Sequence, residues 1–338
     1  MRVLPMVTTV RSFSAIGSLL LGTSLAPDAS AQLPPLGEIG AQYLPSSRVP
    51  EAGGLGAQVS SYDAALAVPT RLDARTFFIA GLQYHMDSVS YSHEPPGFTP
   101  LNALHGLDLT LLLARRLNDR WALAFRVWPG MAGDLERLDS GVLHAGALTM
   151  LTWAPQPRFT LGGGVLASYA FGQLLPLPML YVDWSPRPFF RIEASLPFFA
   201  SGVFRFANRF ELGVLGDVGG NEYAIRKPEI RKVHPCVGGI DDPSTPANEG
   251  RADPASCTDH LAYSIIAAGA IARVRLVSSL WLGTFFGRTL FRRYDLKNVG
   301  GNSVPGGNVD LPNELIFRLG LIFRIPLPDS EPPKQPAP

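Results

Sequence analysis

Residues 315–325 read LIFRLGLIFRI, and this short stretch decides the fold. Every odd position carries a large apolar side chain, whereas the even positions include Arg318, Gly320 and Arg324. Successive side chains of a β-strand point to opposite faces, so the pattern predicts a strand with one wholly apolar face. Such a face needs an apolar environment along the whole length of the strand.

The same alternation recurs along most of the chain. It is clear at residues 121–129, 190–196 and 210–218. It is less regular at residues 75–91, 102–116, 142–153, 158–170, 178–184, 202–207, 260–275 and 281–293. Together with residues 315–325 these segments predict about twelve strands, most of them long enough for the roughly 9 to 11 residues that a tilted strand needs to cross a bilayer.

The links between these segments alternate in length. Tight turns are expected at residues 117–120, 154–157, 185–188 and 277–279, and longer links at 92–100, 131–140, 171–177, 227–259 and 294–312. One link breaks the rule, because residues 196–199 allow only a very short connection on the long-loop side. Short turns at one end and long loops at the other are typical of outer-membrane barrels. The expected fold class is therefore all-β, a closed antiparallel transmembrane β-barrel of about 12 strands, with a range of about 10 to 14.

The composition favours this class over the alternatives. Gly 34 and Pro 31 among 338 residues argue against a protein of long helices, and the long uncharged run at 159–182 is broken by Gly162-Gly163-Gly164 and by Pro176 and Pro178. A soluble β-sandwich would also alternate, but its outer faces should carry lysine and acid, whereas all four lysines fall in predicted loops or the tail. A formal net charge of +1 gives no overall field that would attract nucleic acid.

The N-terminal residues predict export. Arg2 and Arg11 precede an uncharged stretch, and Ala29-Ser30-Ala31 fits a small-residue cleavage site, so residues 1–31 are expected to be a signal peptide removed after Ala31. The alternative, a transmembrane anchor, would need a longer apolar core. We expect residues 32–74 to form an N-terminal lead with room for one extra strand, 75–325 the barrel with a long loop at 227–259, and 326–338 a proline-rich tail. The expected location is the Gram-negative outer membrane.

The two cysteines both fall in the loop at 227–259. In an exported protein, Cys236 and Cys257 most simply form one disulfide with each other. Their spacing matches no zinc motif, and the acidic residues around them fit a solvated loop better than a Ca²⁺ site. The sequence therefore predicts neither a metal nor a cofactor.

Short motifs add a resemblance to a known family. The segment 180–225, with VDWSP at 182–186, ASLP at 194–197 and GGNEY at 219–223, resembles a Gram-negative outer-membrane β-barrel domain family of unknown function. The resemblance covers roughly the mature chain. It implies the fold and the location, and it carries no catalytic residues.

A search for chemistry gives no catalytic residues and no indication of an enzyme. None of the six histidines lies in an H-E-x-x-H motif or beside a G-x-S-x-G elbow. His85 with Asp87 and Ser88 could be drawn into a site by folding, but histidines that hydrogen-bond inside the barrel or at its rim are the simpler interpretation. The glycine-rich stretches lack the context of a phosphate loop.

The polar faces of the strands supply the candidate lumen. Inward arginines outnumber inward acids by about two to one when the polar parity of each predicted strand is taken as lumenal. An open lumen of this kind would favour small anions; alternatively, the charges form an internal ion-pair network with Asp108, Glu193 and Glu211 as partners. The residues expected to line the lumen are Asp108, Arg126, Arg191, Glu193, Arg273, Arg275, Arg288, Arg318 and Arg324.

These observations predict a narrow pore or transporter with an arginine-rich lumen. The alternative is a non-transporting structural or surface-interaction barrel whose cysteine-containing loop contacts a partner; a lipid-modifying barrel enzyme is the third hypothesis. The expected partners are outer-membrane lipid, the barrel assembly machinery and small anionic solutes. No nucleic acid is expected, and the chain should be a monomer.

Overall fold

We describe the fold from a computed structural model, which describes residues 36–49, 55–91, 103–136, 138–170, 173–207, 209–225, 259–298 and 301–324. The predicted signal peptide, the proline-rich tail, Cys236 and Cys257 lie outside these residues. The described chain consists of β-strands and one short 3-10 helix. Their bounds are β1 Gly37–Val49, β2 Leu55–Arg71, β3 Thr76–Tyr91, β4 Leu104–Arg116, β5 Trp121–Val127, β6 Gly130–Gly133, η2 Ser140–Val142, β7 Leu143–Gln156, β8 Phe159–Ala170, β9 Gln173–Arg187, β10 Phe190–Leu196, β11 Phe199–Phe206, β12 Phe210–Ala224, β13 His260–Arg275, β14 Leu280–Lys297, β15 Ser303–Asp310 and β16 Leu315–Phe323.

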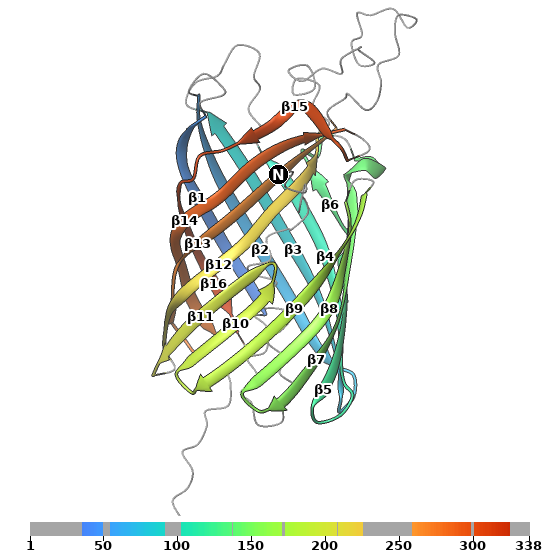
Figure 1. Cartoon of the computed structure of the whole chain (residues 1–338), viewed down its shortest axis with the longest axis vertical. Coiled ribbons are helices and arrows are strands. Elements are labelled where there is room, and N and C mark those ends of the chain that lie inside the picture. Colours follow the sequence, from blue (N-terminus) through green and yellow to red (C-terminus); the bar gives the residue numbers. More distant parts are fainter. Residues whose placement is uncertain are drawn as a thin grey trace, which may run out of the picture.

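The strands form a closed antiparallel barrel (Figure 1). Each barrel strand pairs with its neighbour in sequence, and β16 pairs with β1 to close the ring. β5 and β6 share one position between β4 and β7, and β15 and β16 share one beside β14. The described residues therefore make a barrel of 14 strands, which confirms the predicted fold class within its range of 10 to 14.

The N-terminal segment contributes more to the barrel than expected. Residues 32–74 were predicted to be a lead with at most one extra strand, but they contain both β1 and β2. β1 pairs with β2 on one side and with β16 on the other, and the latter ladder runs from Gly37 opposite Phe323 to Tyr43 opposite Phe317. The apolar face of β16 was easy to recognise; its partner was not, because β1 and β2 carry many small and polar residues.

The outer face of the wall is apolar. Large side chains with the outward parity are exposed all around the barrel, for example Leu66, Val214, Phe286 and Leu319. The nine residues of β16 would span about 23 Å along the barrel axis at a rise of about 3.3 Å per residue and a tilt of about 40°, close to the height of a lipid-facing band. The barrel is thus of the transmembrane, outer-membrane type. Among the described residues no helix is long and apolar enough to cross a membrane.

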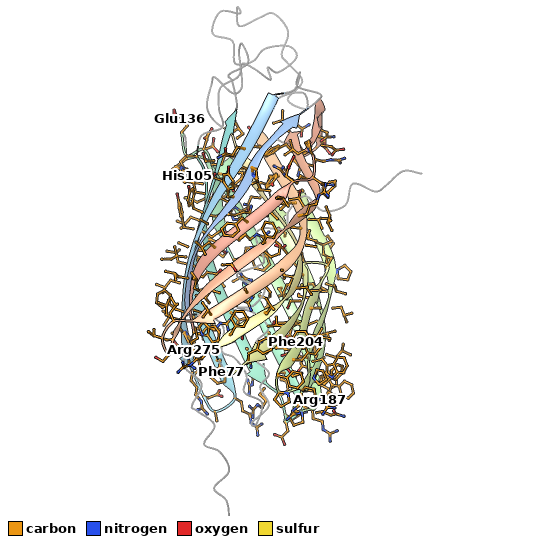
Figure 2. All side chains as sticks on the ribbon, turned by 90° about the vertical axis from the view of Figure 1, so that its left-hand side faces the viewer. Phe77, His105, Glu136, Arg187, Phe204 and Arg275 are labelled. Carbon is orange, nitrogen blue, oxygen red and sulfur yellow. The ribbon has the colours of Figure 1, made fainter. Side chains whose placement is uncertain are left out.

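The two ends of the barrel differ. We call the end with the short turns the turn end and the opposite end the loop end. Aromatic side chains gather near the turn end, where the Trp121 and Trp153 rings stack 6.2 Å apart and Phe204 lies close to Arg187 in Figure 2. An aromatic girdle of this kind is typical of the membrane interface. His105 and Glu136 lie toward the loop end in the same view.

Candidate functional site

The polar side chains of the strands point into the barrel, and most of the predicted lumen residues are among them. Arg318 and Arg324 share the inward parity of buried Ile316 and Ile322 on β16, opposite to exposed Leu319 and its neighbours. By the same alternation of burial, the inward set comprises Asp108, Arg126, Arg191, Glu193, Arg273, Arg275, Arg318 and Arg324.

The prediction was wrong for Arg288. This side chain is exposed and shares the outward parity of Phe286 and Leu290. The pairing of β14 with β13 skips Leu290, since Ile266 lies opposite Phe291 and Ala267 opposite Thr289. A bulge of this kind reverses which parity faces inward. An even-numbered arginine therefore points outward before Leu290 in the sequence and inward after it.

A cluster of three arginines around one carboxylate lies toward the turn end. Glu211 on β12 contacts Arg205 at 3.3 Å, Arg273 at 3.2 Å and Arg324 at 3.6 Å. We call these four residues the turn-end cluster. The four side chains sum to two net positive charges. The next carboxylates, Glu38 and Glu193, each interact electrostatically with Arg273 and Arg324.

The other predicted charges are engaged in separate pairs. Arg191 binds Asp183 through two hydrogen bonds, of 2.9 and 3.0 Å, and lies 3.3 Å from Glu193. Arg126 donates to the Thr110 hydroxyl at 3.1 Å, and its guanidinium lies over the Trp128 ring, 4.8 Å from the centroid. The interior therefore holds much of the ion-pair network that the sequence left open as one interpretation.

Two more of the predicted residues have partners that the sequence did not indicate. Asp108 lies 2.7 Å from the His144 ring nitrogen. Arg275 lies at the turn end, where it donates to the carbonyl oxygen of Ser278 at 3.1 Å.

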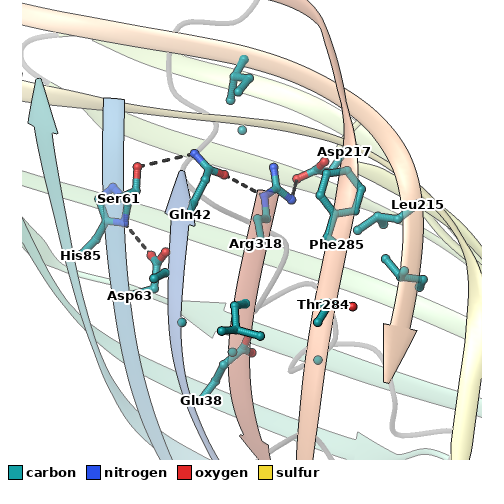
Figure 3. A pocket seen from close by; sticks show the side chains of 18 of the residues that line it. Glu38, Gln42, Ser61, Asp63, His85, Leu215, Asp217, Thr284, Phe285 and Arg318 are labelled. Carbon is teal, nitrogen blue, oxygen red and sulfur yellow. Dashed lines mark hydrogen bonds and ion pairs between the residues drawn. The ribbon is translucent and has the colours of Figure 1, made fainter. Parts of the chain in front are cut away.

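A polar cavity lies inside the barrel against one continuous arc of the wall, formed by β3, β2, β1, β16, β14, β13 and β12 (Figure 3). Its empty volume is about 1030 Å³, counting the part open to solvent. Arg318 is central to it: it donates to Asp217 and to Gln42, both at 2.7 Å, and lies over the Phe285 ring.

Three acidic residues of this cavity were not among the predicted lumen residues, although Asp87 was considered beside His85 as a possible site residue. Glu38, Asp63 and Asp87 come from β1, β2 and β3, and all line the cavity. Because residues 32–74 were expected to precede the barrel, Glu38 and Asp63 were left out of the count of inward charges. The lumen is therefore much less dominated by arginine than the predicted ratio of two to one.

His85 lies between two of these acids. Its Nδ1 is 2.5 Å from Asp63, and its Nε2 is 3.0 Å from Asp87. The hydroxyl of Ser61 donates to Asp87 at 2.5 Å rather than to the histidine. A serine nucleophile needs a histidine as its hydrogen-bonded base, so this cluster does not have the arrangement of a Ser-His hydrolase. In the part of the chain that the structure describes, no group of three or more His, Cys, Asp or Glu is placed to hold a metal ion.

The upper part of β12 crosses the lumen at the loop end. Asn221 and Tyr223 donate to Asp87 on β3 at 3.4 and 2.7 Å, and Ala224 pairs with Gly133 on β6. Both β3 and β6 lie far from β12 in the order of strands around the ring. We call residues 219–225 the β12 cap, because they lie across the interior at the loop end.

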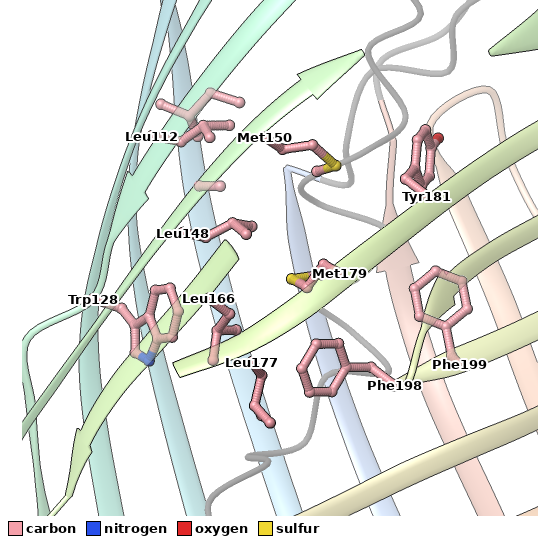
Figure 4. Close-up of a cluster of buried hydrophobic side chains, with 12 residues drawn as sticks. Leu112, Trp128, Leu148, Met150, Leu166, Leu177, Met179, Tyr181, Phe198 and Phe199 are labelled. Carbon is pink, nitrogen blue, oxygen red and sulfur yellow. The ribbon is translucent and has the colours of Figure 1, made fainter. Parts of the chain in front are cut away.

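Part of the interior is filled by a cluster of buried apolar side chains. Figure 4 shows Leu148 and Leu166 close to Leu177, Met179 and Phe198, side chains that come from β7, β8, β9 and the link between β10 and β11. We call this buried set the apolar cluster; its full membership is Ala67, Ile79, Leu112, Trp128, Leu148, Met150, Leu166, Leu177, Met179, Tyr181, Phe198 and Phe199. The barrel interior thus holds an apolar cluster beside its charged pairs, and Arg126 touches the cluster at Trp128.

The chain matches one family model and has weak similarity to several solved structures. The model of a family described as a domain of unknown function, DUF6268, matches residues 27–234. No curated protein matches the chain in sequence. Among solved structures, the COG4313 outer membrane channel from Pseudomonas putida F1 is 12% identical with a TM-score of 0.43, over 87% of this chain and 97% of that one.

Two further solved structures are similar over most of their length. A Pseudomonas aeruginosa FadL homologue is 13% identical with a TM-score of 0.38, over 85% of this chain and 88% of that one. LpxR from Salmonella typhimurium is 7% identical with a TM-score of 0.32, over 85% of this chain and 100% of that one.

Proposed function

The chain belongs to the DUF6268 family, whose function is unknown, and we propose from its own geometry that it is a narrow, capped channel for small anions. The observation that carries the proposal is the turn-end cluster, in which Arg205, Arg273 and Arg324 surround a single carboxylate. Inside a confined passage such an excess of positive charge attracts anions and repels cations.

The pairing of the arginines limits the expected selectivity. One unit charge about 8 Å from the path of an ion contributes about 0.5 kcal/mol at a dielectric constant of about 80, and about 1 kcal/mol at about 40. Because the same charge attracts anions and repels cations, removal of one arginine should change the anion-to-cation permeability ratio by about 1 to 2 kcal/mol, or about six- to thirtyfold. The change should shrink at high salt, because the Debye length falls from about 10 Å at 0.1 M to about 3 Å at 1 M.

The test is the reversal potential of purified protein in a planar lipid bilayer under a salt gradient. We expect an anion-selective wild type and a weaker preference in Arg324→Ser. A matched control is the double variant Arg318→Gln with Asp217→Asn, which removes two charges that sum to zero and should leave the reversal potential nearly unchanged. A cation-selective wild type would contradict the proposal.

A second function is supported by the extent of the internal pairing. If the arginines serve only to fill and fasten the interior, the protein is a non-transporting structural or surface-interaction barrel. Absence of any conductance from correctly folded protein would favour this function over the channel.

The proposed location is the outer membrane, in which the chain would be inserted as a monomer by the barrel assembly machinery. The apolar outer face of the barrel supports this location. Fractionated cells should contain the protein in the outer membrane, and it should migrate differently on gels before and after boiling. Recovery from the soluble periplasm would overturn the proposed location.

A further inference from the structure

The hairpin of β10 and β11 is too short to complete the wall. β10 has 7 residues and β11 has 8, whereas the flanking strands β9 and β12 have 15 each. β10 pairs with β9 only from Leu180 toward the turn end, and β11 pairs with β12 only up to Asp217. Figure 1 shows the hairpin ending partway up the barrel, so among the described residues no strand lies between β9 and β12 above it.

The free edge of β9 is built to remain unpaired. The backbone N–H of Ser185 donates to the carbonyl oxygen of Arg158, the residue before β8. Odd positions of β9 therefore direct their backbone groups toward β8 along this continuous ladder. Pro176 and Pro178 occupy even positions, and their nitrogens therefore face the free edge. Since proline has no N–H, the edge is spared two donors that would otherwise need partners in an apolar surrounding.

On the other side of the gap, β12 turns into the lumen while it stays paired with β13, as far as Ala224 opposite His260. β12 alternates between exposed and less exposed residues up to Val218, but every residue of the β12 cap is buried. Gly220 adopts φ +154°, a conformation that side chains other than glycine rarely adopt, where the strand begins to cross the lumen. The two edges thus diverge above the hairpin, since β9 stays in the wall and β12 runs to the far side of the barrel.

Apolar side chains occupy both faces of β9 at this level. Leu177 and Met179 point inward into the apolar cluster, and Pro176, Pro178 and Leu180 are exposed on the outside. By contrast, the charged pairs that line the rest of the lumen are contributed by other strands or by the turn-end half of β9. A molecule that crosses the wall at this point would meet apolar groups before and after the passage.

Phe198, at the tip of the hairpin, closes this place in the wall. Its side chain is 0% exposed and lies beside Leu177 and Met179 in Figure 4. Its backbone is held on both sides: its N–H donates to Ser195 and its carbonyl accepts from Val218, each at 2.7 Å. The backbone of Phe198 is therefore held in place, and the ring can move away from Leu177 and Met179 only by a change of its side-chain rotamer.

We propose that the gap between β9 and β12 above the β10–β11 hairpin is a lateral portal, plugged by Phe198, that admits small uncharged lipophilic molecules between the lipid layer and the apolar cluster. The class of molecule follows from the lining, because an ion would lose its hydration against these side chains without gaining a partner. The β12 cap lies across the loop end, so the portal offers an entry that does not pass it. This inference does not depend on anion selectivity.

The test is photolabelling of the folded protein in phosphatidylcholine vesicles with a lipid-soluble, uncharged aryl diazirine, followed by residue-level mass spectrometry. We expect label on the inward side chains Leu177 and Met179 at several times the level on Phe285 and Ile316, inward apolar residues of the opposite wall. Phe198→Ala should raise the label on Leu177 and Met179 severalfold.

The controls separate the possible outcomes. Gel migration before and after boiling reports whether Phe198→Ala folds, and Phe198→Leu replaces it if it does not. The comparison of Leu177 and Met179 with Phe285 and Ile316 in the wild type tests the portal without either variant. Equal labelling of the two inward pairs, or no inward label at all, would overturn the portal. A wild type that labels as expected but does not conduct would leave the portal standing and remove the proposed channel.

Discussion

Loosening the β12 cap should open the channel. Tyr223 donates to Asp87 at 2.7 Å, and both side chains are buried, so Tyr223→Phe deletes one charge-assisted hydrogen bond while keeping the ring. A hydrogen bond to a charged group contributes about 1.5 to 3 kcal/mol. Asp87 would retain Ser61 at 2.5 Å and His85 at 3.0 Å, so the interior of the barrel should remain folded.

The loss acts on the attachment of the cap to β3. If the cap is the barrier to ions, a loss of about 1.5 to 3 kcal/mol raises the ratio of open to closed channels at least tenfold. The assay is single-channel recording in a planar bilayer, with open probability as the measured quantity. Tyr62→Phe is the matched control, because Tyr62 faces outward and is 48% exposed. An open probability equal to that of the wild type in a folded Tyr223→Phe protein would refute the assignment of residues 219–225 as the barrier.

Three further results are expected. Arg288→Ser should leave the reversal potential unchanged, because Arg288 faces outward; a shift comparable to that of Arg324→Ser would show that it reaches the lumen. The hydrogen bond from Arg293 lowers the pKa of Asp310 below its ordinary 3.8, so the pair stabilises β15 at pH values above 3.8 and is lost as the pH falls through the lowered pKa. Because the pair is exposed, its contribution to stability should stay below about 1 kcal/mol. Amide hydrogen exchange in β15 should therefore become faster only in that pH range, and Arg293→Gln should not show this change. Thiol labelling without reductant should modify neither Cys236 nor Cys257, and modification of both would exclude the predicted disulfide.

The wall of the barrel was predictable wherever a strand separates lipid from charge. β16 carries Phe317 and Leu319 outward with Arg318 between them. This contrast in hydropathy can be recognised in the sequence without knowing which strands pair with β16. β1 offers a weaker contrast, since Gly40 and Ala41 follow one another on opposite faces. Membership of β1 in the barrel depends on its pairing with β16, which lies nearly the whole chain away in sequence, and no local pattern reports such a pairing.

The site was predictable only in part, for two physical reasons. A bulge shifts the parity of all residues beyond it, so Arg288 and Arg292 cannot both face inward although both numbers are even. The balance of charge in the lumen also depends on counting every strand, and Glu38 and Asp63 belong to strands that the sequence did not include. The arginines were therefore identified more reliably than the net charge of their surroundings.

The irregular link at residues 196–199 was visible in the sequence, although its meaning was not. A regular barrel of this kind alternates short turns and long loops, and a very short link on the long-loop side requires that the two strands it joins end early. When β10 and β11 end early, parts of β9 and β12 lose their neighbouring strand, and unpaired backbone N–H and C=O groups in lipid are energetically costly. On β9, Pro176 and Pro178 remove two of the N–H donors from the unpaired edge. On the other side, β12 turns into the lumen, where it contacts β3 and β6. Two prolines within a strand, a short link and a glycine-rich stretch at 219–220 thus have a common physical cause, an interruption of the wall, and this explains why they lie next to one another in space.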